Sequence, residues 1–163
     1  MTDGRDARSD YEKTIVANVE KHGWHSTYVM ADGDAPGFGY SVGFTKTLGA
    51  PEFIIFGLPQ ALVHSMLWEI FEQIRDGKAV EEGARWSNLI DGYDCISREV
   101  LPGNIVRDYL NSAIWFNGPP PGLRVFQMVW PSNGPGLFPW ERDCAQIVRD
   151  AQPALYEPKG ALS

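Results

Sequence analysis

The chain has 163 residues, of which 44% are hydrophobic and 21% are charged, and its formal net charge is −7 at pH 7. This length is that of one ordinary domain, and the composition is that of a globular protein, which excludes a disordered chain. No apolar run approaches the roughly 18 residues that a membrane-spanning helix needs, and the basic residues are scattered singly, so neither a membrane nor a nucleic acid is an expected partner.

The two ends of the chain and its two cysteines indicate where the protein resides. The first ten residues, MTDGRDARSD, lack the apolar stretch of a signal peptide, so we expect a cytoplasmic protein. We predict one domain over residues 9–157, with flexible segments at 1–8 and 158–163. Cys95 and Cys144 are far apart and form no Cys-x-x-Cys pair, which favours two free thiols in a reducing compartment.

The first half of the chain predicts a helix followed by three strands. Ser9 opens Ser-Asp-Tyr-Glu, the spacing of a capping box, and predicts a helix that ends at Gly23. In residues 37–44 bulky side chains alternate with glycine and serine, which is typical of a strand with one bulky and one bare face. We expect another element to approach the bare face. Segments 26–30 and 53–57 are predicted strands that complete an antiparallel meander.

The second half predicts two helices and two strands. Pro59 begins a helix over 59–76, whose wide apolar stripe is formed by Leu62, Val63, Met66, Leu67, Ile70, Phe71 and Ile74. A helix capped at Asn104 is predicted over 104–116, and strands over 93–100 and 123–130. Since these elements do not repeat as strand–helix–strand units, we predict an α+β domain: a mainly antiparallel sheet of about five strands with about three helices on one face. No element is predicted beyond Ala145.

One short motif resembles a catalytic signature. Gly39-Tyr40-Ser41-Val42-Gly43 matches Gly-x-Ser-x-Gly, which holds a nucleophilic serine on a turn between a strand and a helix. The match lies inside an alternating strand, no helix is predicted to follow it, and no histidine follows His64 to complete a triad. We therefore interpret Ser41 as a structural residue and predict no catalytic residues.

Three histidines, His22, His25 and His64, are the candidates for a metal site. His22 and His25 straddle the end of the first predicted helix, and nothing in the sequence fixes both rings on one side. We expect His22 to lie at the negative end of its helix dipole and His25 to face solvent. We predict neither a metal ion nor a cofactor.

The segment from Val129 to Cys144, VWPSNGPGLFPWERDC, is rigid and aromatic. Pro131 ends the preceding strand because it has no backbone N–H for the sheet, and further prolines and an Asn-Gly turn restrict the chain around Trp140. Two interpretations stay open. The indoles of this segment either cap the core or wall a recess that holds a ligand.

Seven short motifs follow one another along the chain. They are HGW (22–24), FGYSVGF (38–44), PEFIIFGLP (51–59), DGY (91–93), FQMVWP (126–131), FPWE (138–141) and QPAL (152–155). In this order the chain resembles a bacterial family catalogued as domain of unknown function 4262, from about Tyr11 to Leu155. Ser41, Ala50 and Ser132 stand where the family pattern has Thr, His and Asp. The resemblance implies a single bacterial cytoplasmic domain and supplies no reaction.

The function that we predict is non-catalytic binding of a small molecule or a peptide. The predicted ligand-binding residues are Trp24, Tyr40, His64, Trp130, Trp140 and Glu141. The four aromatic residues among them are expected to wall one recess. One alternative is a hydrolase with Glu141 or His64 as acid or base. Another is a protein-partner module such as a toxin immunity protein, because an acidic chain can shield a basic target.

Overall fold

The computed structural model describes residues 9–158, so the predicted flexible ends lie outside the described residues, apart from Pro158. The strands are β1 (His25–Val29), β2 (Phe38–Val42), β3 (Glu52–Phe56), β4 (Arg85–Ile90), β5 (Tyr93–Glu99) and β6 (Val125–Val129). The helices are α1 (Asp10–His22), α2 (Phe44–Leu48), α3 (Gln60–Arg75), α4 (Arg107–Asn117) and α5 (Gln146–Ala151), with a short 3-10 helix η1 (Pro102–Asn104).

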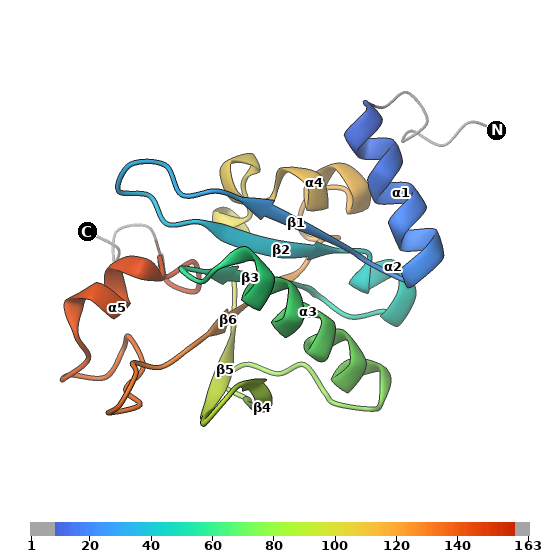
Figure 1. Ribbon diagram of the computed structural model, residues 1–163. Helices are drawn as coiled ribbons and strands as arrows, with labels where there is room; N and C mark the ends of the chain where they lie inside the picture. Colours follow the sequence, from blue (N-terminus) through green and yellow to red (C-terminus); the bar gives the residue numbers. More distant parts are fainter. Residues whose placement is uncertain (1–8, 159–163) are drawn as a thin grey trace.

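The described residues form a single α+β domain around one sheet, whose strand order is β1-β2-β3-β6-β5-β4 (Figure 1). The predicted meander of β1, β2 and β3 is confirmed, and only β3 and β6 run parallel. The prediction of about five strands and three helices missed β4, α2 and α5. Helices α2 and α5 are only five and six residues long, and the pairing of β4 shifts register between Trp86 and Ile90, so none of the three has a sustained period. No helix within residues 9–158 is long and apolar enough to cross a membrane.

Helices cover both faces of the sheet, and the prediction of one covered face was wrong. On β3, Ile54 and Phe56 pack in a cluster with residues of α1 and α4, whereas Phe53 and Ile55 pack in a second cluster with residues of α3. Figure 1 shows α3 on one side of the sheet and α1 and α4 on the other. Alternate residues of a strand point to opposite faces, so the domain has three layers. The signal was present in the sequence, because β3 has no polar face, which is typical of a strand covered on both sides.

Helix α3 packs tightly against β2, as the bare face of that strand predicted. A Cβ atom added at Gly39 would lie 2.6 Å from Cγ1 of Val63. The predicted stripe of α3 is confirmed, since five of its seven residues are buried and the other two are partly buried. Glycine at position 39 therefore sets how closely α3 approaches the sheet.

The ends of two helices test the capping predictions. At Ser9 the capping box is confirmed, because Oγ of Ser9 accepts from the backbone N–H of Glu12 and Oε1 of Glu12 accepts from that of Ser9. The predicted cap at Asn104 was wrong, since α4 begins at Arg107. Asn104 instead donates through Nδ2 to the carbonyl oxygens of Leu155 and Glu157, which fastens the C-terminal segment to the domain. An asparagine can cap a helix or donate to a distant segment, and the choice depends on which backbone groups lie beside it in the fold.

Candidate functional site

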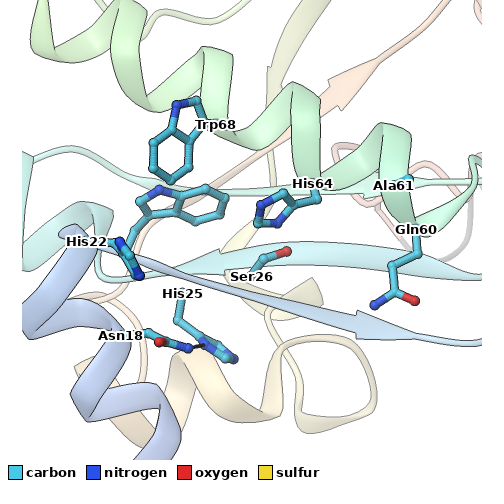
Figure 2. A pocket seen from close by; sticks show the side chains of 9 residues that line it. Asn18, His22, His25, Ser26, Gln60, Ala61, His64 and Trp68 are labelled. Atoms are coloured by element: carbon cyan, nitrogen blue, oxygen red, sulfur yellow. Dashed lines mark hydrogen bonds between the residues drawn. The ribbon is translucent and has the colours of Figure 1, made fainter.

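A cavity of about 840 Å³ lies between α1, β1 and the first half of α3 (Figure 2). Its lining residues are Asn18 and His22 of α1, Trp24 directly before β1, His25 and Ser26 of β1, and Gln60, Ala61, His64 and Trp68 of α3. All three histidines line this cavity, but the structure does not place their rings on one side, since His25 points toward Asn18 and away from His64. Gly23, at φ 91°, ends α1 and turns the chain, so that β1 starts two residues further on.

His25 is buried, with 8% of its surface exposed, and the expectation that it faces solvent was wrong. Its Nδ1 lies 2.9 Å from Nδ2 of Asn18, and its Nε2 lies 2.9 Å from the hydroxyl of Tyr11. Burial, with a smaller effect of the His64 imidazole, lowers the pKa of His25 to about 4. His25 is therefore neutral at pH 7, and protein groups occupy both of its ring nitrogens.

Trp24 forms the floor of the cavity. Its indole stacks on His64, with ring centroids 5.5 Å apart, and also packs against Trp68 and Phe71. Only 2% of Trp24 is exposed, so its ring does not offer a free face to a ligand. Its indole Nε1 is buried without a hydrogen-bond partner within residues 9–158.

The open side of the cavity is formed by His22, His64 and Trp68, which are all exposed at the surface. Trp68 is 40% exposed, and the rings of His22 and His64 lie 6.5 and 6.4 Å from its indole. Neighbouring residues of a strand point to opposite sides, so Ser26 faces His64 and Trp68, whereas His25 points away from them (Figure 2). Gln60 and Ala61 of the lining are exposed as well, so a ligand that enters from solvent meets these three rings and the first turn of α3.

The electrostatic character of the cavity differs from that of the chain as a whole. None of the nine lining residues is an aspartate, glutamate, lysine or arginine, although the chain carries a net charge of −7. No side chain caps α3, and Gln60 and Ala61 of its first turn line the cavity, so the positive end of this helix dipole opens on it. Within residues 9–158, no group of three or more His, Cys, Asp or Glu side chains is arranged to hold a metal ion.

The structure does not bring together the four aromatic residues that were predicted to wall one recess, which are Trp24, Tyr40, Trp130 and Trp140. Tyr40 is buried on the opposite face of the sheet from Trp24, and its hydroxyl accepts from the backbone N–H of Ser112. Trp130 donates through Nε1 to the carbonyl oxygen of Phe56 at 2.7 Å. Of the predicted ligand-binding residues, only Trp24 and His64 line the cavity at α3.

Trp140 lies in another part of the molecule. Its ring stacks on Phe138 with centroids 5.1 Å apart and meets the edge of the Tyr156 ring. The Arg98 guanidinium lies 4.5 Å from the Trp140 ring and 4.2 Å from the Tyr156 ring. These contacts favour the core-capping interpretation of this loop. Trp140 also lines a second cavity, of about 630 Å³, beside α5.

Glu141 closes a turn next to Trp140. Its Oε1 accepts from the backbone N–H of Phe138 at 3.0 Å, and its own backbone N–H donates to the carbonyl oxygen of Phe138. Glu141 lines neither of these two cavities. A role as acid or base beside His64 has no geometric support, because the two residues belong to different parts of the molecule.

Ser41 lies in β2 and is completely buried, which agrees with its interpretation as a structural residue. One premise of that interpretation was wrong, since α2 begins directly after Gly43. The hydroxyl of Ser41 donates to Oε1 of Glu52 at 2.8 Å and accepts from the backbone N–H of Phe53 at 2.9 Å. Its position inside the sheet, and not the absence of a following helix, makes it unsuitable as a nucleophile.

A family model described as domain of unknown function (DUF4262) matches residues 18–145, which is most of the chain. The chain belongs to this family. The DUF4262 match includes all nine residues that line the cavity at α3, whereas the lining of the second cavity extends past its end. No curated protein and no solved structure matches the chain.

The sequence analysis did not name Trp68, which the structure places on the open side of the cavity. A signal was available, because Trp68 lies outside the apolar stripe of α3 and its large ring is therefore on the solvent side of an amphipathic helix. Tryptophan is enriched at binding surfaces, because its ring combines a large apolar area with a polar N–H. His22 was named as a candidate metal ligand and as a residue at a helix end, but not as a ligand-binding residue, since its proximity to α3 depends on the turn at Gly23.

Proposed function

We propose that this DUF4262 domain is a non-catalytic binding protein for a small molecule with a flat ring, which it holds in the cavity between α1, β1 and α3. The observation that carries the proposal is the exposed indole of Trp68, flanked by His22 and His64 above the buried floor of Trp24. The cavity volume of about 840 Å³ lies within the range of ligand sites, which is roughly 300–1,000 Å³. Flat apolar surfaces bind there because water leaves both partners.

The lining favours binding over catalysis. His64 has no carboxylate beside it to orient its ring as a general base, because no acidic residue lines the cavity. Both nitrogens of His25 are engaged by the protein. Asn18, Ser26 and Gln60 remain as polar groups that can orient a ligand by hydrogen bonds. We also propose that the protein resides in the bacterial cytoplasm, which the two free, buried thiols support.

The proposal is tested by screening heteroaromatic fragments against the native protein with ligand-observed NMR. Trp68→Ala should abolish binding of the hits, because the variant loses the exposed ring that contacts them. Trp140→Ala is the matched control, since 39% of Trp140 is exposed compared with 40% of Trp68. Hits that bind Trp68→Ala but not Trp140→Ala would move the site to the second cavity, and the absence of any hit would contradict the proposal. Circular dichroism checks that both variants are folded.

A further inference from the structure

We propose that the ligand of this cavity carries a carboxylate, which the imidazole N–H groups of His22 and His64 hold while its ring lies on Trp68. The inference rests on the proposed function and adds the charge of the ligand. Its starting point is that His22 and His64 lie on the open side of the cavity, next to the same indole.

The two rings are available to a ligand. Within residues 9–158, neither the His22 nor the His64 imidazole forms a hydrogen bond or an ion pair; the His22 ring contacts Trp68, and the His64 ring contacts Trp24 and Trp68. His25 is different, because Asn18 and Tyr11 occupy both of its nitrogens. His22 and His64 thus supply N–H donors that reach solvent, and a protonated ring adds a positive charge.

The charges around the cavity select an anion over a cation. An ammonium group would find no carboxylate in the lining, because none of the nine residues is acidic. It would also lie beside imidazoles that carry positive charge when protonated. A carboxylate is favoured on both counts. Its oxygens accept hydrogen bonds from the imidazole N–H groups, and no acidic residue of the lining repels its charge.

The absence of lysine and arginine from the lining favours a carboxylate over a phosphate group. Proteins usually hold the greater charge of a phosphate with arginine, lysine or several backbone N–H groups. Two imidazoles suit a single negative charge.

Three probes with a common ring test the inference: indole, indole-3-acetate and tryptamine. Their dissociation constants are measured at pH 6.5 by titration calorimetry or by NMR. Indole-3-acetate should bind at least about tenfold more tightly than indole, which corresponds to one charge-assisted hydrogen bond, and tryptamine should bind more weakly than indole. If tryptamine binds as tightly as indole-3-acetate, the cavity selects cations or ignores charge, and the inference is wrong.

Substitution of the two histidines identifies the groups that select the charge. His64→Phe and His22→Phe keep a flat ring and remove the N–H donors, so each should lower the ratio of indole-3-acetate to indole affinity severalfold while indole binding changes little. His64→Gln should restore part of the ratio, because its amide again donates a hydrogen bond. Glu69→Gln is the control, since it removes one charge from α3 outside the cavity lining and should leave the ratio unchanged.

The two proposals fail in different ways. An unchanged ratio in both phenylalanine variants would overturn the inference about the carboxylate and leave the binding of flat rings intact. Failure of indole and of both its derivatives to bind at millimolar concentration would overturn the proposed function itself.

Discussion

The hydroxyl of Ser41 donates a 2.8 Å hydrogen bond to Oε1 of Glu52, and both side chains are completely buried. Glu52 also accepts from the backbone N–H groups of residues 43, 44 and 45, which form the first turn of α2, and from Nδ2 of Asn117 in α4. Burial raises the pKa of Glu52, and the hydrogen bonds from α2 and Ser41 act in the opposite direction. One carboxylate therefore connects β2, α2, β3 and α4.

Replacement of this carboxylate by an amide should destabilise the domain. Glu52→Gln keeps the shape of the side chain, but its NH2 group must face backbone N–H donors that the carboxylate accepted. We expect the free energy of unfolding to fall by about 2–5 kcal/mol, as for buried donors that lose their acceptor. Glu72→Gln is the matched control, because Glu72 forms an exposed ion pair with Arg75 and its loss should cost less than about 1 kcal/mol. Equal urea midpoints for the two variants would contradict this account of Glu52.

The contact between α3 and β2 gives a second prediction. Gly39→Ala should lower the free energy of unfolding by about 1–3 kcal/mol, because its methyl group would overlap Cγ1 of Val63. Val63→Ala removes that atom, so the double variant should be less destabilised than the sum of the two single variants. Gly103→Ala is the control, because a Cβ there meets no atom within 4 Å. Strict additivity in urea denaturation would show that the two positions are not coupled.

The pKa of His25 predicts how stability depends on pH. Between about pH 4 and pH 6.5 the unfolded chain binds a proton at His25 that the native state excludes, so stability is retained above pH 6.5 and falls as the pH is lowered. The loss assigned to His25 between pH 7 and pH 5 should be about 1–2 kcal/mol. His25→Gln should reduce the pH dependence of the urea midpoint by that amount, and the exposed His22→Gln should not. The same pH dependence in all three proteins would refute the buried, neutral state of His25.

Periodic segments of the chain predicted most of the fold. The alternation of large and small side chains predicted the strand β2, the apolar stripe predicted the buried face of α3, and both predictions were confirmed. The strand order was not predictable in the same way, because the neighbour of β3 in the sheet is β6, which comes from a distant part of the chain. Helices α2 and α5 are too short to complete the turns that define a period.

The candidate site was less predictable than the fold. Trp24 and His64 were named as ligand-binding residues, and both line the cavity. Trp130 and Trp140 were grouped with them because rigid aromatic loops often wall a recess. In the structure Trp130 donates a hydrogen bond to Phe56, and the ring of Trp140 packs against Phe138 and Arg98. Whether an exposed indole meets a ligand or its own chain depends on residues remote in the sequence, which composition and spacing do not report.

The parallel pairing of β3 with β6 bears on how the chain acquires its structure. Glu52 pairs with Val125, so β3 has one open edge until β6 has been synthesised. During that interval its unpaired N–H and C=O groups, in a strand with two apolar faces, form a template for pairing with another nascent chain. The residues of the candidate cavity, 18–68, precede β6 entirely. The part of the chain that forms the cavity is therefore synthesised before this edge of β3 is paired, and only β6 closes the edge.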